Sequence, residues 1–241
     1  MSWKRLYNLM VCLIVFTSLS CNNSNNHWKT IKLGGYLLDV PPDFKYKHHT
    51  GIDSEGAEIS SDAITLFTNY GFFTDTLYQT PEEYLNKRYF TSDAATRFMK
   101  SGITYDYKNT PKVELISIGK STKQDSDKIG FFSGSDYIAI CQHAGKPFSW
   151  PVKLPSEVKN HIVKTSLSNN VYTRTARLKG GSPSEIAIYM RDQRTFVKSR
   201  NSYYGIVIGA KHLTAKQQEL VTKIFSTLRP KPVSPIEMDI Q

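Results

Sequence analysis

The side chains best suited to binding a metal lie in one short segment, residues 47–55. This segment reads Lys-His-His-Thr-Gly-Ile-Asp-Ser-Glu and places two imidazoles beside two carboxylates. His48, His49 and Asp53 carry the nitrogen and oxygen donors that divalent metals accept. Adjacent histidines on an extended chain point in opposite directions, so one ion does not readily bind both. We therefore favour a polar surface loop between strands. A metal site, or an enzyme site built from dispersed residues such as these, is the alternative hypothesis.

A basic run in the second half of the chain is the main candidate for binding. The whole formal net charge of +10 lies in residues 111–241, because acidic and basic side chains balance in residues 1–110. The densest basic stretch contains Arg191, Arg194, Lys198 and Arg200, with Asp192 the one acid among them. Such a cluster attracts anionic polymers or lipid headgroups, most strongly at low salt. The alternative, which we favour, is an ordinary solvated face of a basic protein.

The sequence lacks the short motifs of common catalytic sites. It contains no Gly-x-Ser-x-Gly, no His-Glu-x-x-His and no Gly-x-x-x-x-Gly-Lys phosphate loop. Cys141 ends an apolar run typical of a strand, which favours a buried and inert thiol over a reactive one. The residue pattern therefore predicts no cofactor and indicates a protein that is not an enzyme.

The first twenty residues have the pattern of a secretion signal. Lys4 and Arg5 precede an apolar stretch over residues 9–16, and small residues follow it. The stretch is too short to span a hydrocarbon core of roughly 30 Å comfortably as a helix. Residues 18–21, Ser-Leu-Ser-Cys, resemble a lipobox, although Leu19 stands one position later than is usual. The resemblance implies a bacterial lipoprotein that is cut before Cys21 and acylated on that cysteine; ordinary signal cleavage nearby is the alternative.

This processing sets the expected location and partners of the chain. Residues 21–27 are polar and would form a tether between the lipid and the folded part. Cys141 would be the remaining unmodified cysteine, so no disulfide within the mature chain is expected. We expect a cell-envelope protein held to a membrane facing the periplasm or the exterior, with an anionic surface, polymer or envelope protein as a further partner. Nucleic acid is a poor partner for such a chain.

Hydrophobic patterning predicts one α+β domain over residues 28–229. Strands are expected at 31–33, 36–40, 63–67, 113–118, 137–141, 161–168, 171–178, 185–191 and 203–210. The last of these is apolar or small throughout, which is typical of a central strand. Thr80 and Thr214 open two helices with capping-box patterns, and Pro230 ends the second helix and begins a proline-rich tail over 230–241.

Two parts of this pattern resemble a known fold. The strand at 203–208 followed by the helix to Leu228 is similar to the ending of PsbP and Mog1-like proteins, and Leu37 to Phe44 resembles their opening. The resemblance implies an antiparallel sheet flanked by helices in an α/β/α sandwich. Proteins of that fold are mostly accessory or binding proteins, so the resemblance implies a binding role by analogy. We therefore expect a non-enzymatic binding or accessory module with an unspecified ligand.

Overall fold

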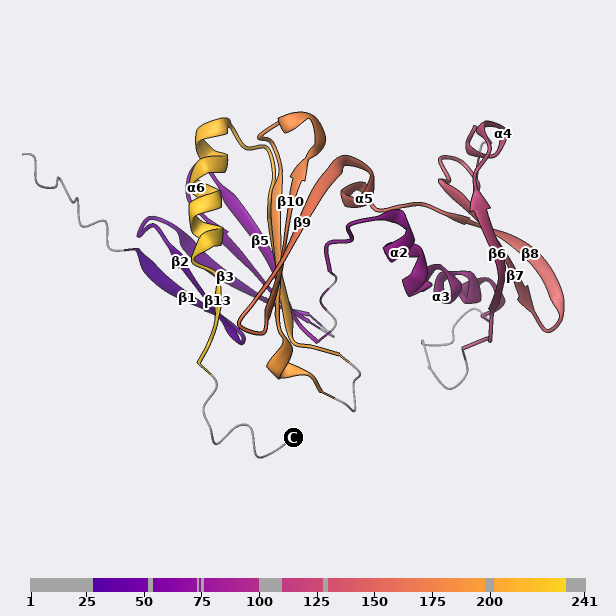
Figure 1. The fold of residues 1–241 in the computed structure, drawn as a ribbon, viewed down its shortest axis with the longest axis horizontal. Helices are drawn as coiled ribbons and strands as arrows, with labels where there is room; N and C mark the ends of the chain where they lie inside the picture. The colour runs from indigo at the N-terminus through magenta and orange to yellow at the C-terminus, as the bar shows by residue number, and fades with distance from the viewer. Residues whose placement is uncertain are drawn as a thin grey trace, which may run out of the picture.

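The chain folds into a main lobe and a small lobe. The computed structural model describes residues 28–51, 54–72, 74, 76–99, 110–127, 130–197 and 202–232. Its helices and antiparallel sheets confirm the α+β class, with strands predominating. Figure 1 shows the small lobe, residues 81–152, at one end of the long axis and the remaining elements at the other. No helix in these ranges is long and apolar enough to cross a bilayer.

A seven-stranded antiparallel sheet forms the main lobe. Its order is β3 (Lys45–Thr50), β4 (Glu55–Ser60), β5 (Thr65–Gly71), β12 (Gly205–Ala210), β11 (Ile186–Asp192), β10 (Val171–Leu178) and β9 (His161–Ser168). Residues 203–210 were predicted to contain a central strand. This is confirmed, because β12 lies in the middle of the sheet, between β5 and β11. The strands predicted at 161–168 and 171–178 are present as β9 and β10. Asn169 and Asn170 form the turn between them, and both adopt the positive φ that such a turn needs.

One face of this sheet is covered by α6 (Ala215–Ser226) and a three-stranded sheet of β1 (Lys29–Leu33), β2 (Tyr36–Val40) and β13 (Arg229–Pro230). The Thr214 hydroxyl accepts from the Gln217 backbone, and the Gln217 side chain accepts in return from the Thr214 N–H. This capping box starts α6 as predicted. Pro230 pairs with β2, so the predicted tail begins with a residue of the sheet. Residues 233–241 lie outside the described ranges.

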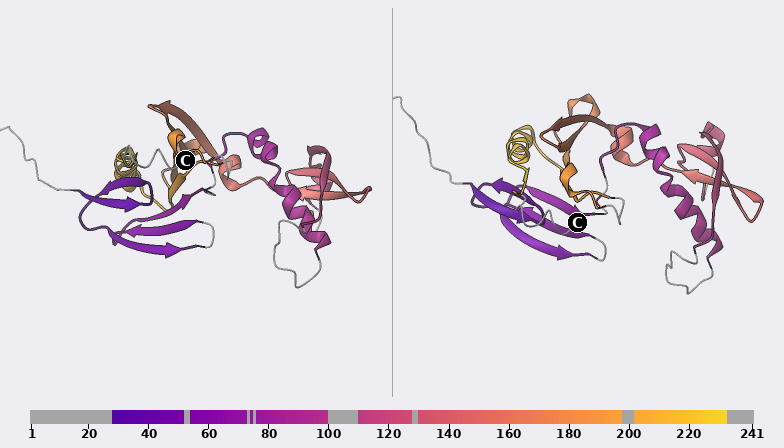
Figure 2. Two further views of the ribbon diagram at one scale, coloured as in Figure 1. Left: turned by 90° about the horizontal axis from the view of Figure 1, so that it is seen from below. Right: turned by 60° about the horizontal axis from the view of Figure 1, so that its bottom comes forward.

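The small lobe has its own sheet and core. It contains α2 (Pro81–Lys87), α3 (Tyr89–Ala95), the short helices η1 (Thr96–Phe98) and α4 (Lys123–Ser126), and strands β6 (Glu114–Lys120), β7 (Tyr137–His143) and β8 (Lys146–Val152). Phe90 of α3 packs with Ala139, Cys141 and Val152 in this core. The lobe is inserted between β5 and β9, and the helix α5 (Ser156–Asn160) leads back to the main sheet (Figure 2).

A partly buried ion pair joins the two lobes. Arg174 of β10 donates to both carboxylate oxygens of Glu83 in α2, at 2.7 and 2.9 Å, and to the Leu77 carbonyl at 2.7 Å. Glu83 accepts from the Gln79 backbone N–H instead of that of Thr80, although the Thr80 hydroxyl still caps the helix. The expected capping box is therefore half formed, because the glutamate is shared with Arg174.

Candidate functional site

The proposed metal segment is a strand hairpin over most of its length, which corrects the expected surface loop. His48 and His49 both lie in β3, opposite Ala57 and Gly56 of β4. As neighbours on a strand their side chains point to opposite faces, and His48 Nε2 lies 3.4 Å from a Glu55 carboxylate oxygen. Asp53 is outside the described residues. Within those residues, no three His, Cys, Asp or Glu side chains gather where they could hold a metal ion.

Arg191 and Arg194 of the predicted basic cluster do not act together in the structure. Arg191 lies in β11, and Arg194 lies in the following turn η3 (Gln193–Thr195). The Arg194 Nε donates to Asp192 Oδ1 at 2.9 Å, so this guanidinium is paired with the buried carboxylate of Asp192. Burial alone would raise the pKa of Asp192, but the bonds from Arg194 lower it. Lys198 and Arg200 lie outside the described residues.

Arg191 instead forms part of a row of aromatic and cationic side chains. Its guanidinium carbon is 4.4 Å from the ring centroid of Tyr172 and 4.7 Å from that of Tyr203. Arg174 also lies over Tyr172, at 5.2 Å, and Phe196 packs against Tyr203 with 4.9 Å between ring centroids. We call these five residues the arginine–tyrosine ladder. The two ring contacts hold the Arg191 guanidinium in one plane, and they do not neutralise its positive charge.

Strand register places the ladder on the sheet face opposite α6. Tyr172 of β10 is directly opposite Arg191 of β11, and Arg191 is opposite Gly205 of β12. The side chains of β11 alternate between the two faces: Met190 packs in the α6 core, whereas Tyr189 belongs to a separate cluster with Leu77 on the other face. A Cβ at position 205 would lie 3.1 Å from the Tyr189 ring, so glycine there gives this ring room.

The absence of an acidic partner among the described residues distinguishes Arg191 from Arg174 and Arg194. Arg174 has Glu83 and Arg194 has Asp192, but Arg191 has no acidic partner in the part of the chain that the structure describes. Its Nε is buried and has no hydrogen-bond acceptor among those residues. Burial raises the pKa of Tyr189, and the positive charge of Arg191 partly opposes that rise. The arrangement can therefore accept a carboxylate or another oxyanion at the guanidinium edge.

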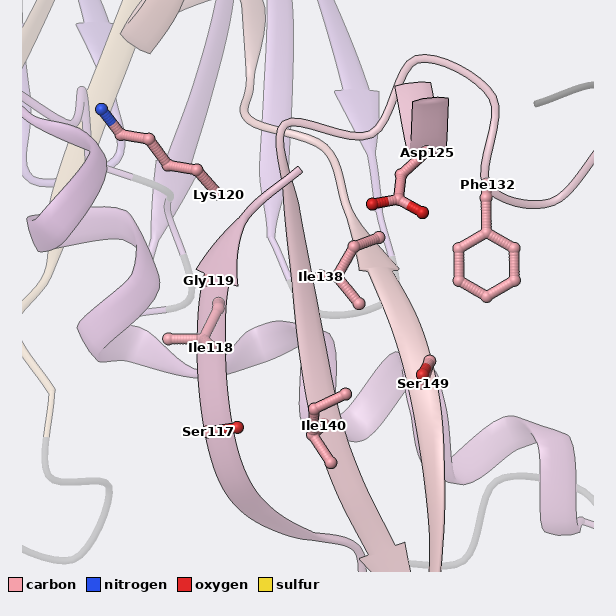
Figure 3. Close-up of a pocket in the computed structure, with 9 residues that line it drawn as sticks. All are labelled: Ser117, Ile118, Gly119, Lys120, Asp125, Phe132, Ile138, Ile140 and Ser149. Atoms are coloured by element: carbon pink, nitrogen blue, oxygen red, sulfur yellow. The ribbon is translucent and has the colours of Figure 1, made fainter. Parts of the chain in front are cut away.

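A second surface feature lies on the small lobe. A hollow of about 400 Å³ lies on the outer face of β6–β8. Ile138 and Ile140 form its apolar floor, with Ser117 and Ser149 beside them (Figure 3). Asp125 borders the hollow, and its carboxylate accepts from the Thr122 backbone N–H at 3.3 Å as part of the capping box of α4. This lining offers contact area and no evident set of groups for acid–base or nucleophilic chemistry.

Cys141 is fully buried in the small-lobe core, and burial raises the pKa of its thiol. This fits the prediction of an inert cysteine.

Sequence reasoning missed Tyr172 and Tyr203 as partners of Arg191. The alternation of β10 places Tyr172 and Arg174 on one face, but only the register with β11 shows which face it is. No protein-family model matches this chain, and a comparison with the curated proteins finds no match.

Proposed function

We propose that this chain is a lipid-anchored envelope protein that binds a carboxylate-bearing partner through Arg191, without catalysing a reaction. The observation that carries the proposal is the Arg191 guanidinium, which is held between Tyr172 and Tyr203 and has no acidic partner among the described residues. An arginine in a fixed plane offers two parallel N–H donors that match the geometry of a carboxylate. The anchor part of the proposal rests on the signal pattern and on Cys21, as argued from the sequence.

A PsbP or Mog1-like sandwich remains our proposal for the main lobe. Its support is an antiparallel sheet covered on one face by a C-terminal helix, α6, and by an N-terminal hairpin, β1–β2. One feature departs from that pattern. The helix that begins at Pro81 packs against β6–β8 and reaches the second face of the main sheet through the ion pair of Glu83 with Arg174.

The ladder has the composition of a binding surface. Arginine and tyrosine are enriched at the energetic centres of protein interfaces, where they combine apolar area with polar groups. Phe196 is 38% exposed at one end of the ladder, and Leu167, opposite Tyr172 on β9, is 61% exposed. These apolar side chains would pack around a partner while Arg191 binds its carboxylate. The basic second half of the chain favours an acidic partner.

The test uses a chain lacking residues 1–21, so that lipid plays no part. All three hydrophobic cores lie between Ile31 and Leu228, so the truncation leaves them intact. Binding to polygalacturonate and to polyglutamate is measured at low and at physiological salt. Arg191→Gln should weaken binding about tenfold or more, because a hydrogen bond to a charged group contributes about 1.5–3 kcal/mol. Arg191→Lys should also weaken it, since lysine keeps the charge but loses the paired donors.

Lys146→Gln is the matched control, because it removes one exposed positive charge at the distant β7–β8 turn. Equal losses for Lys146→Gln and Arg191→Gln would mean that only net charge matters. The variant with Arg191, Arg194, Lys198 and Arg200 all changed to Gln tests the wider basic cluster. Binding to anionic vesicles without binding to either polymer would identify phosphate headgroups as the ligand. No binding at low salt would refute the proposal.

A further inference from the structure

A second hollow, of about 340 Å³, opens in the small lobe between α3 and the end of β8. Aromatic rings form much of its wall, and two charged side chains border it. The residues that matter for its chemistry are Tyr84, Phe90, Asp93, Phe131, Trp150 and Lys153. The hollow is separate from the arginine–tyrosine ladder, which belongs to the main lobe, and from the outer face of β6–β8.

The rings of this hollow are arranged as in a partial cage. Phe131 and Trp150 are in edge-to-face contact, with centroids 4.8 Å apart and planes at 74°, so the ring faces that this contact leaves open point in two different directions. Phe131 is 54% exposed, which is unusual for a phenylalanine in contact with a core residue. Tyr84 of α2 provides a third ring at the wall. Aromatic faces attract cations through the negative charge of the ring faces.

Asp93 supplies a negative charge at the same place. Although the residue as a whole is exposed, its carboxyl group is partly screened from water, and this raises its pKa. In the described ranges that carboxylate has no ion pair and no hydrogen-bond donor. The ammonium of Lys153 does not neutralise it, because Lys153 Nζ lies beside Gly134, 4.0 Å from where a Cβ on that glycine would be. A partly desolvated carboxylate without a partner favours a positively charged ligand.

We propose that this hollow binds a small organic cation, with its ammonium group against Phe131 and Trp150 and its charge opposite Asp93. A purely apolar ligand would leave Asp93 more desolvated and still unpaired. An anion would be repelled by Asp93. A bare metal ion would find only one carboxylate among the residues that line the hollow, which is too few for stable coordination. A methylated ammonium can pack its methyl groups against the aromatic rings and place its positive charge opposite the carboxylate of Asp93.

The experiment titrates the full chain, kept in solution with a non-ionic detergent, with choline and with its uncharged carbon isostere, dimethylbutanol. Binding is followed by the broadening of the ligand methyl signals in NMR spectra. Choline should bind and dimethylbutanol should not. Asp93→Asn should weaken choline binding by about tenfold, and Phe131→Leu should weaken it several-fold. Lys153→Gln should strengthen binding, because it removes a like charge from the rim.

Asp62→Asn is the control, since Asp62 is an exposed carboxylate in the main lobe. Asp93 and Phe131 are exposed, so their variants should keep the fold, and circular dichroism checks this. Equal binding of choline and dimethylbutanol would overturn the proposal. So would unchanged choline binding by folded Asp93→Asn, or weaker binding by Lys153→Gln. None of these outcomes bears on Arg191, so this proposal and the proposed function fail independently.

Discussion

We expect Glu83→Gln to destabilise the protein more than any substitution of an exposed glutamate, because it removes the partner of a buried arginine. The Arg174 side chain is 8% exposed and that of Glu83 is 32% exposed. Arg174 makes two of its three hydrogen bonds to the Glu83 carboxylate, at 2.7 and 2.9 Å. Its third bond, to the Leu77 carbonyl, would remain.

The size of the effect follows from this geometry. Breaking a fully buried ion pair by removing one partner costs about 3–5 kcal/mol. Glu83 still reaches water, and glutamine keeps one oxygen that can accept from Arg174. We therefore expect the free energy of unfolding to fall by about 2–3 kcal/mol, which is at or below the lower limit for a fully buried pair. With a urea dependence of about 2 kcal/mol/M, the midpoint should fall by roughly 1 M.

Urea unfolding provides the assay, followed by circular dichroism for the sheets and by tryptophan fluorescence, to which Trp28 of the main lobe and Trp150 of the small lobe both contribute. Glu82→Gln is the matched control, because Glu82 is exposed in the same first turn of α2. Glu82→Gln should lower the free energy of unfolding by no more than about 0.5 kcal/mol. A double-mutant cycle with Arg174→Met should show a coupling of about 1–3 kcal/mol between the two residues. Equal midpoints for Glu83→Gln and Glu82→Gln would refute the reasoning.

The pH dependence gives an independent check on the same ion pair. Burial alone would raise the pKa of Glu83, but hydrogen bonds from Arg174 and from the Gln79 N–H lower it overall. A carboxyl group with a lower pKa in the folded state stabilises the fold fully above its unfolded pKa of roughly 4.3. That contribution is lost as the pH falls through the folded value. The difference between wild type and Glu83→Gln should therefore shrink below about pH 4.

Two further predictions concern the anchor and the core. Cys21→Ser should abolish acylation and release the protein from membranes; equal labelling of mutant and wild type by a fatty-acid probe would end the lipoprotein hypothesis. Phe225→Ala should lower the free energy of unfolding by about 3–5 kcal/mol, since Phe225 is 4% exposed within the main core. An unchanged denaturation midpoint would show that the packing of α6 is misassigned.

Local patterns in the sequence predicted the elements that have local causes. The hairpin at Asn169 and Asn170 needs two residues that tolerate positive φ, and α6 needs a cap and an apolar stripe, and both signals can be read directly. By contrast, every residue of β3 is exposed, so this edge strand shows no alternation of apolar and polar side chains. Pro147 and Pro151 similarly make β8 hard to predict, because a sequence with prolines is usually taken as evidence against a strand. The prolines are tolerated because β8 lies at the edge of its sheet.

The candidate site was less predictable, because the residues that form it are distant from one another in the chain. Charge counting identified Arg191 and Arg194 as equivalent, but the structure separates them. Asp192, two positions away in the sequence, forms an ion pair with Arg194. Glu83, in the other lobe, forms an ion pair with Arg174. Only pairing across strands places Tyr172 against Arg191, the arginine of the three that has no acidic partner among the described residues. The sequence alone does not specify that register.

The insertion of the small lobe between β5 and β9 has a consequence for the order of folding. The centre of the main sheet is the pairing of β5 with β12, which joins a strand in the first third of the chain to one near its end. Closing such a loop costs conformational entropy before any contact offsets it, and folding rates fall as contacts become less local. The contacts of α3 with β6–β8 are closer in sequence. We therefore expect the small lobe to acquire structure early, and the main sheet to close slowly and last.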